Sequence, residues 1–293
     1  MSESSTDRKA LVRTLNRTAA HYDPSLPALR QLNAELLERL RYFALDPRCI
    51  LELGAAQCQA ALELRRRFPN AQILALDLSL AMLQGAPRSW WPRARFHRVA
   101  CDAARLPLRE HSVDLVYSSL LLPSCNQPES VFRELTRVLK PGGLFLFATL
   151  GPGTLTELRR AWQSADDHEH VSLFPNLPQL GDALTQSGLV EPVMDVEEHS
   201  MHLPDVSALI RLLKQLGAQN AAGARGRGLT GRQRLQAMAR AYESARTQAG
   251  LPATFEVIFG AAFAGVRVAG RGSSNSNPSE IAIPVPSLRT RSR

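Results

Sequence analysis

The chain has 293 residues, 44% of them hydrophobic and 21% charged, a length that suits one domain of roughly 250 residues and a tail. No apolar run approaches the ~18 residues of a membrane span, and residues 1–9 lack the apolar stretch of a signal peptide, so we expect a cytoplasmic protein without a membrane partner. The net charge of +8 comes mostly from arginine, and clusters such as residues 65–67 indicate either a solvated surface or attraction to an acidic partner. The four cysteines have no CxxC spacing, which argues against a metal site or a disulfide framework.

Leucines at helical spacing between residues 8 and 43 are interrupted by the Asp23-Pro24 turn signal and predict two helices within residues 1–44. Short apolar strands then alternate with helices, which predicts right-handed crossovers and a parallel sheet. Pro141-Gly142-Gly143 is expected to end the last of these helices. The expected strands lie at 49–53, 72–76, 94–99, 113–117 and 144–149, and the expected helices at 57–67, at 131–139 and after a cap at Ser79.

Beyond residue 151 the pattern becomes mainly helical, with two further strands. The expected helices lie at 154–165, 177–187, 205–217 and 230–249, and the expected strands at 193–197 and 255–259. We therefore predict an α/β domain over residues 45–269, a doubly wound, mostly parallel seven-stranded sheet with cap helices inserted at about 154–249. Residues 270–293 are rich in Ser, Pro, Asn and Arg and are expected to be a disordered tail.

Four consecutive strands end in residues that suit one adenosyl ligand, which in such sheets lies outside the carboxyl ends of the strands. An acid and a tight glycine turn, Glu52 and Gly54, end the first strand. Asp77 ends the second, where a carboxylate can accept both ribose hydroxyl hydrogens, and Asp102 ends the third, where it can accept from an adenine amino group. The residues expected around the ligand are Glu52, Gly54, Ala56, Asp77, Leu78, Asp102, Ala103 and Ser118, with Ser118 and Ser119 near the reacting centre.

A dinucleotide-dependent enzyme is the nearest alternative, because it shares the first glycine and the acid after the second strand. The third-strand acid Asp102 disfavours it, as does the segment Arg137-Val138-Leu139-Lys140-Pro141-Gly142-Gly143. That segment, together with Leu76-Asp77-Leu78-Ser79 and Asp114-Leu115-Val116-Tyr117-Ser118, resembles the motif series of class I S-adenosylmethionine (SAM)-dependent methyltransferases.

Within that group the chain resembles the malonyl-[acyl-carrier protein] O-methyltransferases of biotin synthesis, over about residues 17–263. The narrower signals are Thr149-Leu150-Gly151-Pro152-Gly153-Thr154-Leu155 and Leu251-Pro252-Ala253-Thr254-Phe255. The resemblance implies SAM as co-substrate and methylation of the free carboxylate of a malonyl thioester on acyl carrier protein or coenzyme A. It also implies a monomer without a nucleic-acid partner, and a lid role for Tyr22, for which a packed, half-buried tyrosine is the alternative.

The chain departs from the family pattern in the first loop, where the family has three alternating glycines. Here Gly54 is followed by Ala56 and Cys58 at the other two glycine positions. Two alternatives therefore stay open: a relative that uses this fold for different chemistry, such as a hydroxylase, and a non-catalytic binding protein. His170 is a further candidate for lining the site; it lies in an Asp/His/Glu run that superficially suggests a metal site, but a polar helix end is expected there instead.

Overall fold

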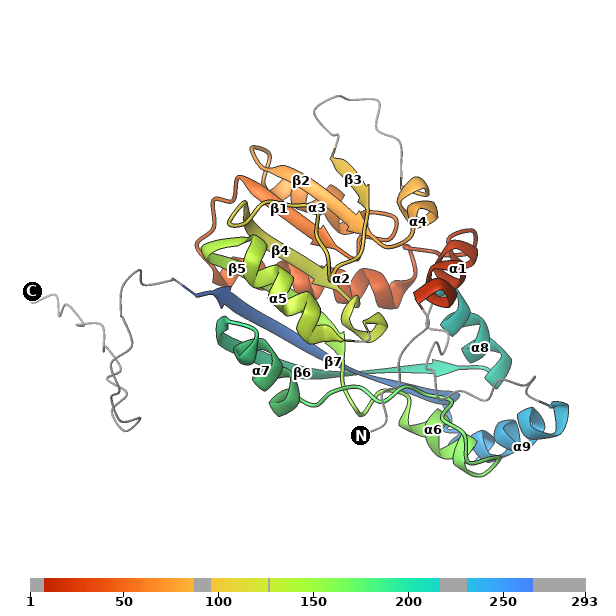
Figure 1. Cartoon of the computed structure of the whole chain (residues 1–293). Coiled ribbons are helices and arrows are strands. Elements are labelled where there is room, and N and C mark those ends of the chain that lie inside the picture. Colours follow the sequence, from red (N-terminus) through yellow and green to blue (C-terminus); the bar gives the residue numbers. More distant parts are fainter. Residues whose placement is uncertain (1–7, 87–95, 126, 217–230, 266–293) are drawn as a thin grey trace, which may run out of the picture.

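The computed structural model describes residues 8–86, 96–125, 127–216 and 231–265 (Figure 1). The tail expected at 270–293 lies outside these ranges. The chain begins with the two helices that the leucine spacing predicts, α1 (Arg8–Thr18) and α2 (Pro27–Arg39), and a 3₁₀ turn at Leu40–Tyr42 follows. Proline opens α2 at a position where its missing N–H costs nothing.

The centre of the molecule is a seven-stranded sheet in the order β3-β2-β1-β4-β5-β7-β6. Its first five strands run parallel, whereas β7 is antiparallel to both β5 and β6. The prediction of a doubly wound, mostly parallel sheet is therefore confirmed. The strands are β1 (Cys49–Leu53), β2 (Gln72–Asp77), β3 (His97–Ala100), β4 (Val113–Ser119), β5 (Leu139–Leu150), β6 (Leu189–Leu203) and β7 (Leu251–Ala264).

Three of these strands are longer than the sequence pattern predicts. β5 begins at Leu139 and passes through Pro141-Gly142-Gly143, because a register shift against β4 between Val113 and Leu115 takes up the extra residues as a bulge. β6 and β7 form a long antiparallel ribbon, paired from Leu189 to Leu203. On β6 the half-exposed, polar composition hides the strand from a hydrophobicity pattern.

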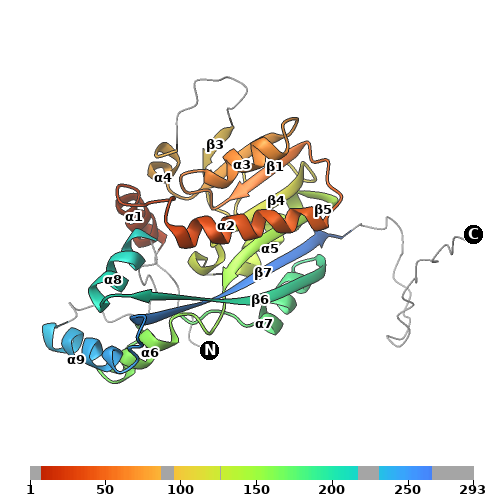
Figure 2. The ribbon, with the colours of Figure 1, turned by 180° about the vertical axis from the view of Figure 1, so that it is seen from behind.

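Helices cover both faces of the sheet. On one face α2 lies beside α3 (Gln59–Arg67), as Figure 2 shows from behind. Leu36 of α2 and Leu64 of α3 are completely buried in the same hydrophobic cluster. On the other face α5 (Pro128–Val138) packs beside α7 (Leu177–Gln186). The short helix α4 (Leu80–Gln84) follows β2 and begins with the predicted Ser79 cap, whose Oγ accepts the Met82 N–H at 3.1 Å.

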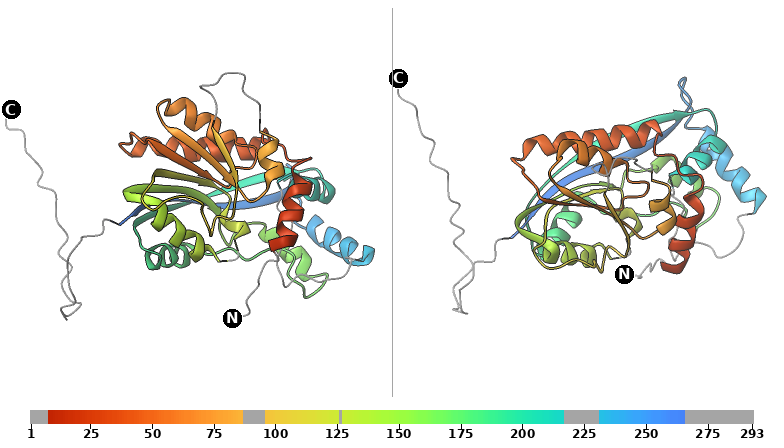
Figure 3. Two further views of the ribbon diagram at one scale, coloured as in Figure 1. Left: turned by 45° about the horizontal axis from the view of Figure 1, so that its top comes forward. Right: turned by 90° about the horizontal axis from the view of Figure 1, so that it is seen from above.

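A third hydrophobic cluster, separate from those on the two faces of the sheet, stabilises the cap. The cap consists of α6 (Thr156–Gln163), α8 (Val206–Gln215) and α9 (Arg232–Glu243) around the far end of the β6–β7 ribbon (Figure 3). The predicted cap segment also contains α7, but α7 packs on the sheet against α5. The two family-like segments meet at the cap's base. The N–H groups of Gly151 and Leu155 donate to the carbonyls of Glu256 and Thr254, at 2.9 and 2.7 Å. No helix within the described ranges is long and apolar enough to cross a membrane.

Candidate functional site

A cavity of about 810 Å³ lies at the carboxyl ends of the parallel strands. Its walls come from the loops after β1, β2, β3 and β4, from the N-terminal helices, from the start of α5 and from Leu216, which follows the cap helix α8. The structure therefore brings together most of the residues that the strand ends predict. Those that line the cavity are Tyr22, Glu52, Gly54, Ala56, Asp77, Leu78, Asp102, Ala103 and Ser119.

The loop after β1 turns through backbone conformations that normally call for glycine. Gly54 has φ +78°, and a Cβ there would lie 2.9 Å from the Leu121 Cβ. Ala56 and Cys58, at the two positions where the family pattern has glycine, also have positive φ, +44° and +61°. A residue with a side chain is strained in this region by roughly 1–2 kcal/mol. The loop therefore keeps the backbone conformation of the family pattern although two of its three glycines are replaced.

Asp77 lies where a ribose-binding acid is expected, and the backbone holds it in place. Its Oδ2 accepts the Ala56 N–H at 2.9 Å and its Oδ1 accepts the Ser79 N–H at 2.8 Å. Burial raises the pKa of this carboxyl, and the backbone N–H donors partly offset the rise. A carboxylate offers about four acceptor sites, more than these backbone donors use, so the group can still accept a hydroxyl hydrogen from a ligand.

Glu52 is buried and acts first as a helix cap. Its Oε2 accepts the N–H of Ala61 at 3.0 Å, in the first turn of α3. Burial raises its pKa to about 8, so the group is mostly protonated at neutral pH until a cationic ligand enters the cavity. Glu52 and Asp77 both line the cavity. A positively charged sulfonium beside them would favour their ionised forms.

Tyr22 follows α1 and lines the cavity on its N-terminal side. Burial, followed by the charges of Glu52 and Asp77, raises the pKa of its phenol to about 12, so the hydroxyl stays a hydrogen-bond donor. Gln57, which the sequence does not single out, lies between this segment and the β1 loop. Its Nε2 is 3.5 Å from the carbonyl oxygens of both Ala19 and Tyr22.

Two predicted residues are not brought to the cavity. Ser118 is buried under the β1 loop, where its Oγ donates to the Leu53 carbonyl at 3.0 Å; strand alternation turns Ser119 toward the cavity instead. His170 lies near α6, with its ring stacked on Trp162 at a centroid distance of 3.6 Å and its Nε2 2.7 Å from Asp166 Oδ1.

Arg105 is a further cavity residue that the sequence does not single out. Among the described residues that line the cavity, it is the one with a cationic side chain. Its backbone N–H donates to the Asp102 carbonyl at 2.9 Å, in the turn that follows β3. In the sequence it is one of many arginines, and only its place on this turn distinguishes it.

The chain is similar in sequence to known proteins over most of its length. The malonyl-[acyl-carrier protein] O-methyltransferase of Methylovorus sp. (strain MP688) is 41% identical over 263 residues, which are 88% of this chain and 89% of that protein. The protein of the same name from Gallionella capsiferriformans (strain ES-2) is 38% identical over 269 residues, 90% of this chain and 93% of that one. The chain belongs to this family. A methyltransferase domain model also matches residues 51–147, which decides against the dinucleotide enzyme.

Solved structures show the same fold at low identity. Geranyl diphosphate C-methyltransferase from Streptomyces coelicolor A3(2) superposes with a TM-score of 0.52 at 15% identity, covering 89% of this chain and 99% of that one. The [4+2]-cyclase SpnF gives 0.54 at 18% identity, covering 91% and 98%. Family membership makes the chain a methyltransferase with SAM as its co-substrate, and the acids and turn of the cavity fit that ligand.

Proposed function

We propose that this chain transfers the methyl group of SAM to the free carboxylate of a malonyl thioester carried by acyl carrier protein, an early step of biotin synthesis. The names of its relatives support this acceptor. Within the cavity the proposal rests on Arg105, because a guanidinium is the side chain best suited to pair with a carboxylate.

The site is suited to a reaction that needs no base. A free carboxylate is already ionised at neutral pH and needs no base to become a nucleophile. The Tyr22 phenol, whose pKa burial raises to about 12, stays protonated. SAM supplies an electrophilic methyl group. The protein then has to align the acceptor oxygen with that methyl and keep water away from it. We propose that Asp77 and Asp102 bind the adenosyl group, that Arg105 orients the acceptor and that Tyr22 covers the site.

The carrier protein is acidic in the proposed complex, and the arginine-rich surface provides the complementary charge. We expect higher salt to slow association with malonyl carrier protein and to leave SAM affinity nearly unchanged. The expectations of a cytoplasmic monomer without a nucleic-acid partner stay predictions.

Product analysis tests the acceptor. The protein is incubated with SAM and one of three acceptors: malonyl carrier protein, malonyl coenzyme A or, as a control, acetyl carrier protein. Mass spectrometry then measures the masses of the products. The proposal predicts one added methyl group on the malonyl compounds and none on the acetyl control. Binding of SAM without any transfer would favour the non-catalytic alternative, and a different product would favour other chemistry on this fold.

Arg105 is tested by a matched pair of variants. Arg105→Gln should lower kcat/KM for malonyl carrier protein by roughly 10- to 100-fold, the value of a hydrogen bond to a charged group, with SAM affinity kept. Arg109→Gln removes an exposed arginine nearby that does not line the cavity and should leave kcat/KM within about twofold. Equal losses in both variants would contradict the role given to Arg105. Restoration of biotin-independent growth in a strain lacking this methyltransferase tests the pathway.

A further inference from the structure

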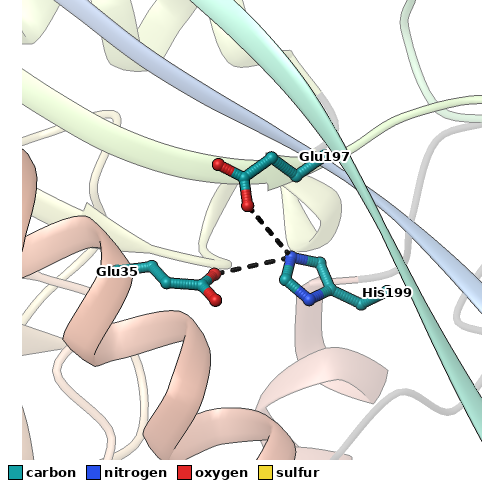
Figure 4. Close-up of side chains that lie close together, drawn as sticks. All are labelled: Glu35, Glu197 and His199. Carbon is teal, nitrogen blue, oxygen red and sulfur yellow. Dashed lines mark ion pairs between the residues drawn. The ribbon is translucent and has the colours of Figure 1, made fainter.

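A cluster of metal-ligating side chains lies between α2 and β6, outside the cavity. Glu35 projects from α2, and Glu197 and His199 project from one face of β6, two residues apart (Figure 4). His199 Nε2 lies 3.4 Å from Glu35 Oε2 and 3.8 Å from Glu197 Oε2. The three potential ligand atoms all lie within 4.8 Å of one another.

Each carboxylate is already oriented by a neighbour that uses only one of its oxygens. Gln31 Nε2 donates to Glu35 Oε1 at 2.9 Å, and the Arg39 guanidinium donates to Glu197 Oε1. The other oxygen of each group is left facing His199. Neighbours that hold one oxygen and aim the other are the usual outer support of a metal ligand.

Two of the converging atoms are buried without a hydrogen-bond partner. They are Glu35 Oε2 and His199 Nε2, which face each other. The two atoms lie within ion-pair range of each other, 3.4 Å apart, but form no hydrogen bond. A buried polar atom without a hydrogen bond costs roughly 1–3 kcal/mol, so a ligand held between the two would be stabilising. A cation bound by both atoms would satisfy the two at once.

The charge of the cluster points to a divalent ion. Asp195 joins it by pairing with Arg39 at 2.7 Å. Three carboxylates, from Glu35, Asp195 and Glu197, stand against the one guanidinium of Arg39, which leaves two negative charges when His199 is neutral. A divalent cation would balance these charges.

We propose that Glu35, Glu197 and His199 bind a divalent transition-metal ion of the Zn²⁺ type, with an open position for water. One imidazole and two carboxylates are ligands that Zn²⁺ accepts. Ligand bonds of about 2.0–2.2 Å place neighbouring ligand atoms roughly 3.3–3.5 Å apart in a tetrahedral site, close to the separations around His199. None of the three residues lines the cavity, so the ion would clamp α2 to the β6–β7 ribbon and take no part in methyl transfer.

Zn²⁺ titration of the chelator-treated full chain tests the site, followed by calorimetry and by the unfolding temperature. Wild type should bind Zn²⁺ and unfold at a higher temperature with it, whereas Mg²⁺, which prefers six oxygens, should do little. His199→Gln should weaken Zn²⁺ binding at least about tenfold. His202→Gln, an exposed histidine three residues further along β6, is the control and should bind as wild type does.

Absence of Zn²⁺ binding to wild type, or equal binding by His199→Gln, would overturn the proposal. Glu35→Gln provides the same test from α2 if the His199 variant does not fold.

Discussion

The strained loop after β1 gives a prediction whose sign depends on one backbone angle. Ala56 has φ +44° and donates its N–H to Asp77, an interaction that glycine would keep. Ala56→Gly removes roughly 1–2 kcal/mol of strain, and greater freedom of the unfolded chain returns about 0.4–1 kcal/mol. We therefore expect the variant to unfold with a free energy about 0.5–1 kcal/mol higher than wild type.

Ala55→Gly is the matched control, one residue earlier in the same loop. Ala55 is buried and its φ is not positive, so the substitution relieves no strain. The substitution removes a buried methyl group, which contributes about 0.8 kcal/mol, and increases the freedom of the unfolded chain as Ala56→Gly does. We therefore expect its free energy of unfolding to be about 1–2 kcal/mol lower than that of wild type. Equilibrium urea unfolding of the three proteins measures both changes.

SAM titration by calorimetry then shows whether the loop limits binding. Removal of the Ala56 methyl lets the backbone approach the ligand more closely, so Ala56→Gly should bind SAM more tightly than wild type. Cys58→Gly is a less clean test than the sequence suggests, because Cys58 is fully buried in the core and the exchange would leave a hole. Destabilisation by Ala56→Gly as large as that by Ala55→Gly would refute the strain argument.

Three further predictions follow from buried groups. Asp77→Ala should weaken SAM binding by about 1.5–3 kcal/mol in calorimetry, and unchanged affinity in the folded variant would contradict the ribose assignment. Burial raises the pKa of Glu52 from 4.5 to about 8, so its contribution to the free energy of unfolding is full below pH 4.5 and is lost as the pH rises through 8. Over that window the free energy of unfolding of Glu52→Gln should therefore rise relative to that of wild type, by up to several kcal/mol. Parallel pH profiles of stability for the two proteins would refute this. Gly260→Ala places a Cβ against the buried Phe147 ring and should lower the free energy of unfolding by about 1–3 kcal/mol, measured with urea. Gly231→Ala is the control, because a Cβ there meets open space and should leave stability nearly unchanged. Equal effects of the two substitutions would count against the packing argument.

The strand-end acids were predictable because parallel strands deliver their carboxyl ends to one edge of the sheet. Glu52, Asp77 and Asp102 therefore meet at the cavity as the spacing predicts. The positive φ of Ala56 and Cys58 was not predictable from composition, since neither residue type signals that conformation. Only the position within a glycine-rich pattern pointed to it.

Other parts of the site depend on contacts between distant segments. Gln57 lies near the Ala19 and Tyr22 carbonyls, and no local pattern pairs these positions. The cluster of Glu35 with Glu197 and His199 joins residues more than 150 positions apart across a strand whose polar composition concealed its length. Periodicity describes the neighbours along one element and carries no information on such pairings.

The cap and the N-terminal helix α1, which border the cavity on different sides, differ in how firmly they are attached to the sheet. The cap is attached through β6 and β7, whose backbone hydrogen bonds continue into the sheet. Among the described residues, α1 contacts α4 through the Ser79 hydroxyl, which donates to Asn16 Oδ1 at 2.6 Å. The long Gln57 contacts lie next to α1. Amide protons of α1 should therefore exchange with solvent long before those of β7. Ligands would then enter and leave the cavity on the α1 side, and binding of SAM should slow the exchange of amide protons there first.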